Sequence, residues 1–205
     1  MSEMWDSRYS AEGYAYGSEP NEFFKDSLSK YNLTGSILFP AEGEGRNAVY
    51  AAKKGLTVSA FDISIEGKKK ALQLAEKENV EINYALGDFF ELDLIHQKFD
   101  AAALIYAHFP PSILSKFYTK IGEMISPNGL IILEGFSKNN LKYREENPGI
   151  GGPDKLEMLF STESIQNLFP DFEIIELEEV VVELNEGKFH NGQGSVIRFV
   201  GKRKP

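Results

Sequence analysis

The sequence predicts an α/β fold in which helices cover both faces of a mostly parallel, seven-stranded sheet. Two observations indicate this fold. Between residues 36 and 133, short runs that are apolar throughout alternate with helix-like segments, and strands of this kind are buried on both faces, as in parallel sheets. After residue 172, apolar residues instead recur at every second position, which predicts an antiparallel hairpin that ends the sheet.

The elements can be assigned in order along the 205 residues. Pro20 precedes the first helix, Ser64 and Ser161 are suited to cap two later helices, and Gly55 ends another. The expected helices cover residues 21–31, 47–54, 64–77, 111–125 and 161–169. The expected strands cover residues 36–39, 56–61, 81–86, 99–106, 130–133, 172–184 and 195–200. The stretch 136–160 carries glycine, proline and charge without a period, which is typical of a long functional loop.

The composition is that of an ordinary globular protein, with 42% hydrophobic and 26% charged residues. A net charge of −9 argues against a nucleic acid as partner, because nucleic-acid binding needs a basic surface. Since the chain has no cysteine, disulfides and thiolate metal sites are excluded, and no other cluster has the spacing of a metal site. No segment resembles a signal peptide or approaches the ~18 apolar residues of a membrane span. We therefore expect a cytoplasmic protein without a membrane partner.

Three successive strand ends carry residues suited to a nucleoside. Gly43 and Gly45 form a turn after the first strand, where glycine lets a ligand approach the backbone closely. Asp62 ends the second strand, where a carboxylate accepts hydrogen bonds from ribose hydroxyls. Asp88 and Phe89 follow the third strand and suit an adenine, which needs an acceptor and an aromatic surface. Ligands of open α/β sheets bind beyond these carboxyl ends, so the spacing predicts a nucleoside site there.

The residues at these strand ends do not by themselves identify which nucleoside-containing cofactor binds. The segment GEGRNA, residues 43–48, matches the G-x-G-x-x-G/A pattern of dinucleotide-binding proteins. An NAD(P)-dependent oxidoreductase is therefore one alternative. That alternative predicts a second mononucleotide-binding half or a substrate domain, for which the remaining chain, ending in loops and a hairpin, offers little room.

Three segments resemble class I S-adenosylmethionine-dependent methyltransferases. LFPAEGEGRNAVYAAKKGLTVSAFDIS is similar to the first motif and second strand of that family, and ISPNGLIILEGF to its fifth strand. The GRN triplet and the lead-in WDSRYSAEGYAYGSEPNEFF resemble the tellurite-resistance and thiopurine methyltransferase-like branch. The resemblance implies a Rossmann-like methyltransferase domain with an N-terminal lid and helix (residues 1–33), a cofactor-binding core (34–135), a loop over the site (136–160), and a helix with a C-terminal hairpin (161–205).

The resemblance also implies the cofactor, S-adenosyl-L-methionine, with S-adenosyl-L-homocysteine as product. The residues expected to bind it are Arg8, Tyr16, Gly17, Glu42, Gly43, Gly45, Asn47, Asp62, Ile63, Asp88, Phe89 and Tyr106. Among these, the glycines would approach the methionine part, Asp62 the ribose, and Asp88 with Phe89 the adenine. Tyr106 would line the pocket near the sulfonium, while Arg8, Tyr16 and Gly17 would close over the amino-acid end.

The first motif departs from the family at two positions. The family often has an acid before a three-glycine motif, and this chain has Phe39 and Ala41 in those places. That acid usually helps to orient the amino group of the cofactor. Its replacement leaves the contact to Glu42, to Glu44 or to backbone carbonyls. A non-catalytic S-adenosylmethionine-binding protein is therefore a third hypothesis.

The expected acceptor is a small molecule, and the resemblance suggests a thiol or a chalcogen compound. Such acceptors ionise readily, whereas an oxygen or nitrogen acceptor often needs a general base. Tyr106 and His108, at the end of the fourth strand, are the candidate catalytic residues. His190, in the connection within the final hairpin, is a further candidate base.

Overall fold

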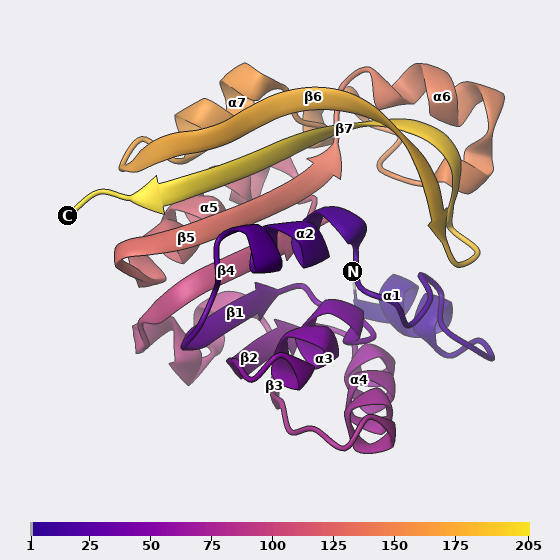
Figure 1. Ribbon diagram of the computed structural model, residues 1–205. Coiled ribbons are helices and arrows are strands. Elements are labelled where there is room, and N and C mark those ends of the chain that lie inside the picture. Colours follow the sequence, from indigo (N-terminus) through magenta and orange to yellow (C-terminus); the bar gives the residue numbers. More distant parts are fainter. Residues whose placement is uncertain (1) are drawn as a thin grey trace.

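The structure is a computed structural model that describes residues 2–205. Within these residues, seven strands form one sheet in the order β3-β2-β1-β4-β5-β7-β6, and β7 runs antiparallel to both of its neighbours (Figure 1). The strands are β1 (Ser36–Pro40), β2 (Thr57–Asp62), β3 (Asn83–Leu86), β4 (Phe99–Ile105), β5 (Ile125–Phe136), β6 (Phe172–Glu186) and β7 (His190–Arg203). The α-helices are α1 (Ser2–Tyr9), α2 (Glu22–Lys30), α3 (Arg46–Lys53), α4 (Ile65–Lys77), α5 (Pro111–Met124), α6 (Asn140–Glu146) and α7 (Thr162–Leu168). This architecture confirms the expected fold class.

Each face of the sheet carries its own apolar layer. On one face, Phe24 of α2 and Ala48 of α3 pack with Phe39 of β1. On the other face, Tyr118 of α5 and Ile165 of α7 pack in a larger cluster with residues of β1, β4 and β5. Because neighbouring residues of a strand point to opposite faces, a strand covered on both sides has to be apolar throughout, as the sequence showed.

The strand order reverses between β1 and β4, which lie side by side at the centre of the sheet. Connections from these two strands leave toward opposite edges, so the chain separates above their carboxyl ends. In open α/β sheets this is where ligands bind. Figure 1 shows α1 beyond this end of the sheet, and the long β6–β7 hairpin curves so that its tip lies near α1.

Two helices lie where the sequence indicated irregular chain. Helix α1 lacks an apolar period and is held by tertiary contacts, including a bond from the Ser64 hydroxyl to Asp6 Oδ1 of 2.6 Å. Helix α6 lies within the segment expected to be a loop, together with short 3₁₀ turns. Its first residue, Asn140, is fully buried and accepts a hydrogen bond from the backbone of Ser195 on β7. Tertiary bonds of this kind leave no periodic trace in a sequence.

The final hairpin is longer than its pattern predicts. Pairing continues to Glu186 and His190, so only residues 187–189 of the connection expected at 185–194 form a turn, and the others are strand. These residues are mostly glycine and polar, without an apolar period, because this part of the hairpin extends beyond the end of β5. The expected turn at residues 127–129 likewise lies inside β5, where Asn128 has a φ of 67°. In the described part of the chain, no helix is both long and apolar enough to cross a membrane.

Candidate functional site

A cavity of about 500 Å³ lies beyond the carboxyl ends of the central strands. Its walls come from α1, from the turns that follow β1, β2, β3 and β4, from the end of β5, from residues 152–158 and from the hairpin tip. Most of the lining is apolar or aromatic, with a few carboxylates at strand ends. This composition is typical of a site for a small organic ligand.

The glycine turn shapes the cavity from behind rather than lining it. Gly43 and Gly45 have φ values of 63° and 87°, which favour glycine over any other residue. A Cβ on Gly43 would lie 2.6 Å from the Tyr9 hydroxyl, and one on Gly45 would lie 2.6 Å from Cβ of Ala71. The turn is therefore packed tightly against α1 and α4. The residues of the turn that line the cavity are the two preceding ones, Ala41 and Glu42.

The two departures from the family motif have structural explanations. Phe39 is fully buried and packs edge-on against Phe24, with ring centroids 5.3 Å apart, so this position belongs to the core beneath α2. Ala41 has a φ of 52°, a left-handed conformation that glycine adopts without strain. The backbone at this position thus has the conformation that glycine favours, although the residue is alanine.

Of the two carboxylates beside the glycines, Glu42 and Glu44, only Glu42 lines the cavity. Its Oε1 accepts the backbone N–H groups of Asn47 and Ala48, each at 2.8 Å, at the start of α3. Burial raises the pKa of Glu42 to about 7, against the opposing effect of these two bonds. Glu44, the other candidate, instead binds the backbone of Ala15 and the ammonium of Lys70. Of the two, Glu42 is the one placed to meet a ligand.

The next strand ends supply the other predicted residues. Asp62 is buried, accepts the backbone N–H groups of Gly43 and Ser64, and lines the cavity together with Ile63. Desolvation raises the pKa of Asp62 above its ordinary value. Asp88 is exposed at the rim, while Phe89 is buried with its ring stacked on Phe61 at 5.0 Å. The predicted acids and the aromatic residue therefore meet in one cavity.

The N-terminal segment covers one side of the cavity. Arg8 donates a 2.7 Å hydrogen bond to the Tyr16 hydroxyl and lies over the rings of Trp5 and Phe189. Arg8, Tyr16 and Trp5 line the cavity, whereas Gly17 lies outside the lining, near Gly187. Sequence analysis did not select Trp5, although a single tryptophan in a polar lead-in was an available signal.

The GRN triplet joins the glycine turn to the N-terminal segment and to the tip of the β6–β7 hairpin. Arg46 is buried and its guanidinium binds the carbonyl of Tyr16 at 3.1 Å and Oε2 of Glu186 at 2.9 Å. Asn47 Oδ1 accepts the backbone N–H of Asn21, whose side-chain amide in turn donates to Glu134 and Glu186. Arg46 also lines the cavity, which the sequence analysis did not predict, although its place within the GRN triplet could have indicated it.

Tyr106 follows β4 in a strained conformation. Its φ is 55°, and among the described residues only Ala41 shares this feature without being glycine or asparagine. Both of them line the cavity, and strain of this kind persists where the surrounding structure enforces it. The Tyr106 hydroxyl donates to Oε1 of buried Glu134 at 2.8 Å. Burial raises the pKa of Tyr106 well above 10, so this hydroxyl stays protonated.

His108 lines the cavity, but both of its ring nitrogens are bonded to the backbone. Nδ1 lies 2.8 Å from the carbonyl of Met158, and Nε2 accepts the N–H of Phe136 at 2.9 Å. Burial lowers the pKa of His108 to about 4, so the ring is neutral. In this arrangement neither nitrogen is free to take a proton from a ligand. His108 instead fixes the 152–158 segment against the end of β5.

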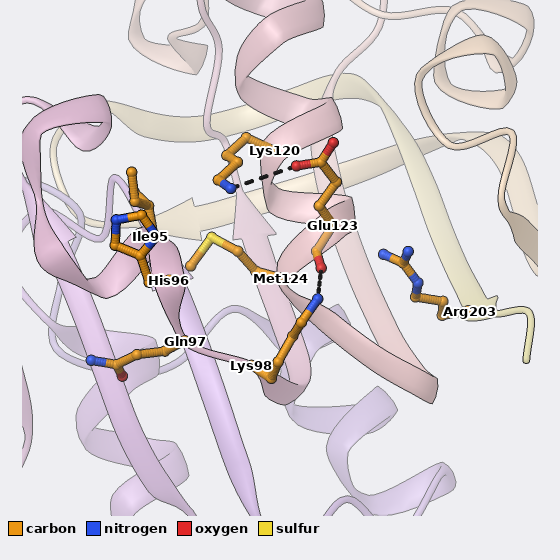
Figure 2. Close-up of a pocket in the computed structure, with 8 residues that line it drawn as sticks. All are labelled: Ile95, His96, Gln97, Lys98, Lys120, Glu123, Met124 and Arg203. Atoms are coloured by element: carbon orange, nitrogen blue, oxygen red, sulfur yellow. Dashed lines mark hydrogen bonds and ion pairs between the residues drawn. The ribbon is translucent and has the colours of Figure 1, made fainter.

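A second hollow, drawn in Figure 2, lies at the opposite end of the sheet around His96. Its basic residues terminate α5. Lys98 donates to the carbonyl of Glu123 at 2.6 Å, and Arg203 donates to the carbonyl of Gly122. Cations at a helix C-terminus satisfy its free carbonyls, so this hollow is explained by helix capping. The described residues contain no group of His, Asp and Glu side chains that could hold a metal ion.

Comparisons with known proteins agree with this geometry. Residues 37–129 match the family model described as a methyltransferase domain, and this span contains the glycine turn and the ends of β2, β3 and β4. No curated protein matches the chain in sequence.

Many solved structures share the fold. One, from work on the conversion of a disulfide bond into a thioacetal group during echinomycin biosynthesis, has a TM-score of 0.81 and 15% identity over 100% of this chain and 92% of its own. TehB from Haemophilus influenzae has a TM-score of 0.70 and 15% identity, covering 99% of this chain and 67% of its own. Magnesium protoporphyrin IX methyltransferase from Synechocystis PCC 6803, solved with bound SAH, has a TM-score of 0.66 and 17% identity, covering 88% and 80%. This chain thus has the Rossmann-like fold of class I methyltransferases.

Proposed function

We propose that this chain is an S-adenosylmethionine-dependent methyltransferase that acts on a small molecule. The observation that carries the proposal is the cavity at the switch point between β1 and β4. It brings together, in the expected order, a carboxylate beside the glycine turn, Asp62 at the end of β2, and Asp88 with Phe89 after β3. The match to a methyltransferase domain and the fold support the same conclusion.

The cofactor is S-adenosyl-L-methionine, and the residues present fit its parts. Both backbone bonds of Glu42 end on Oε1, which leaves Oε2 for a cation such as the ammonium of the methionine. Asp62 would accept the ribose hydroxyls, and Asp88 with Phe89 would hold the adenine. The cation would also favour the charged form of Glu42, which burial alone disfavours.

Bound S-adenosylmethionine supplies a methyl group on a sulfonium, and the protein supplies position and a dry environment. Trp5 and Arg8 of α1 cover one side of the cavity, and Phe136 and Met158 belong to the rest of its lining. Tyr106 stays protonated and held by Glu134, so it orients rather than removes protons. In this proposal His108 is a positioning residue of the acceptor wall.

We assign the acceptor to small, largely apolar molecules with a thiol or chalcogen group. The aromatic lining of the cavity supports this class, and the net charge of −9 disfavours nucleic acid. The GRN triplet and the N-terminal lead-in, together with the likeness to TehB, support placement in the tellurite-resistance and thiopurine methyltransferase-like branch.

Thermal unfolding in the presence of ligands tests the cofactor. A ligand that binds only the native state adds about 2.7 kcal/mol at roughly 100 times its dissociation constant. We expect this stabilisation with S-adenosylhomocysteine and none with NAD(H). Stabilisation by NAD(H) alone would instead identify a dinucleotide-binding oxidoreductase.

Two aspartate variants sharpen the test. Asp62→Ala should abolish most of the S-adenosylhomocysteine effect. Asp100 is the matched control, because it also accepts a backbone N–H, from Ser36, but lies at the opposite end of the sheet. Asp100→Ala should lower the melting temperature while leaving the ligand-induced increase intact. Binding without methyl transfer to any acceptor would indicate the non-catalytic alternative.

A further inference from the structure

His190 and Glu186 form a hydrogen-bonded pair across the hairpin turn. Nδ1 of His190 lies 3.0 Å from Oε2 of Glu186, and His190 lines the cavity although 95% of its surface is covered. Glu186 is fixed in turn by the Arg46 guanidinium at 2.9 Å and by the Asn21 amide at 3.0 Å. The carboxylate therefore has one position, and it holds the imidazole in one orientation.

The pair determines which nitrogen carries the proton. The bond to His190 and the charge of Arg46 lower the pKa of Glu186 to about 2 although burial opposes them, so the carboxylate is ionised and only accepts hydrogen bonds. The proton must then lie on Nδ1 of His190. Burial lowers the pKa of His190 below 6.5, so at neutral pH the ring is uncharged and Nε2 holds a free lone pair.

Nε2 is an unbonded acceptor on a ring that lines the cavity. It makes no hydrogen bond within residues 2–205, and no fully buried side-chain nitrogen or oxygen in that range lacks a partner. Nε2 is therefore not sealed inside the protein. The neighbour at this edge of the ring is Gly151, where an added Cβ would lie 3.3 Å from Nε2. Absence of a side chain there keeps the nitrogen uncovered.

The ring also lies beside the expected site of reaction. Its centroid is 4.3 Å from the ring of Tyr106, at the end of β4, and 4.5 Å from that of Tyr16. His108 differs from His190 in this respect, because both of its ring nitrogens are hydrogen-bonded to the backbone.

The other charges around His190 come from different elements. Arg8 of α1 and Arg46 of α3 lower the pKa of His190, and Glu186 raises it. Tyr16 and Tyr106 are neutral because burial raises the pKa of each hydroxyl. Together these groups leave the His190 ring unprotonated, and therefore able to accept a proton, at neutral pH.

We propose that His190 is the general base of the methyl transfer to the thiol acceptor of the proposed function, and that Glu186 holds it in position. This deepens the proposed function and rests on it. The thiol proton moves to Nε2 of His190 as the acceptor sulfur bonds to the methyl carbon. The bond between that carbon and the sulfonium breaks, and its electron pair stays on the departing sulfur as neutral S-adenosylhomocysteine. Solvent then removes the proton from His190.

The state of the pair can be measured without turnover. The chain has only three histidines, His96, His108 and His190, so ¹⁵N long-range spectra of the full-length protein can resolve each ring. We expect His190 as the Nδ1–H tautomer, protonating only below pH 6.5, and a mixture of tautomers in Glu186→Gln. Protonation of Nε2 at pH 7.5 would overturn the proposal.

Catalysis is tested with two thiols of similar size, benzenethiol and phenylmethanethiol. Phenylmethanethiol is the weaker acid and needs the base more. His190→Asn keeps a donor for Glu186 but has no base, and should lower kcat/KM for phenylmethanethiol by about 100-fold or more. The loss should be much smaller for benzenethiol, which ionises by itself. Glu186→Gln should lower the rate and move its acid limb to lower pH, because the carboxylate raises the pKa of His190.

The outcomes separate this proposal from the function on which it rests. His96→Gln, altered in the distant hollow of Figure 2, should match the wild type in both assays. Affinity for S-adenosylhomocysteine should stay within about twofold in His190→Asn. Equal losses with both thiols would show a structural role for His190, and no transfer to either thiol with the cofactor product still bound would overturn the acceptor class. Failure to bind S-adenosylhomocysteine would instead reject the proposed function.

Discussion

At the scale of single residues, Glu42 links the glycine turn to the cavity. Its side chain accepts backbone N–H groups at the start of α3, and it also lines the cavity. Burial raises the pKa of its carboxyl group to about 7. A group in that state responds strongly to a nearby cation, so we expect pH to affect stability and cofactor binding together.

The sign of the effect follows from the raised pKa. In the unfolded chain Glu42 ionises near 4.5, whereas in the folded protein it ionises near 7. The folded state therefore holds an extra proton between these values, and the contribution of Glu42 to stability falls as pH rises through that window. Glu42→Gln, which stays neutral, should gain on the order of 2 kcal/mol relative to the wild type between pH 5 and pH 8. Urea unfolding of both proteins measures this difference.

Ligand binding provides the complementary readout for Glu42. Because the cofactor ammonium favours the charged carboxylate, affinity for S-adenosylhomocysteine should rise from pH 5 to pH 8 in the wild type. The dependence should flatten in Glu42→Gln. Parallel pH profiles for the two proteins would contradict the assignment of Glu42 to the ammonium.

At the scale of elements, Asn21 connects segments that are far apart in the sequence. Its side chain caps α2 through Phe24 N–H and donates to Glu134 of β5 and Glu186 of β6. One amide thus joins the N-terminal segment to the sheet and to the hairpin. The loss of such a residue removes a helix cap and leaves two buried carboxylates each short of a donor.

Asn21→Ala should therefore destabilise the protein by about 2–4 kcal/mol, the sum of a lost cap and two weakened buried hydrogen bonds. Ser161→Ala is the control, because Ser161 caps α7 in a capping box away from the cavity and should cost only ~1 kcal/mol. Denaturant unfolding compares the two. Equal costs would mean that the amide bridge contributes nothing beyond the cap.

At the scale of the whole molecule, the sheet ends in the exposed strand β6. Val181 of this edge is 54% exposed, and Glu179 and Glu183 flank it on the same face. Free edge strands invite pairing with another chain, and charges on the edge discourage this. We infer that these glutamates keep the edge from self-association.

Glu183→Val should therefore promote self-association, visible as an increase in mass by sedimentation at equal protein concentration. Glu163→Val makes the same change of side chain and charge on the exposed surface of α7 and should leave the mass unchanged. An identical increase in both variants would point to net charge rather than to the edge.

The sequence predicted the central parts of this molecule better than its margins. The apolar strands and capped helices between residues 36 and 133 were confirmed because both faces of the sheet are covered by local, periodic elements. Asp62 and Asp88 could be located since Asp62 ends one strand and Asp88 lies two residues beyond the end of the next. Helix α1, helix α6 and the pairing between Glu186 and His190 depend on contacts across the chain, which no local pattern records. The free nitrogen of His190 and the occupied ones of His108 needed coordinates for the same reason.

The anchoring of α1 bears on how often the proposed enzyme can act. Trp5 and Arg8 line one side of the cavity, and the helix is fastened by Asp6 to Ser64 and by Arg8 to Tyr16. A spent cofactor cannot depart through this wall until those bonds open. Lid opening limits turnover in many enzymes, and we propose that α1, Ser2–Tyr9, acts as such a lid. If this proposal holds, the rate of product release depends on residues of α1, which lie far in sequence from the groups proposed to perform the transfer.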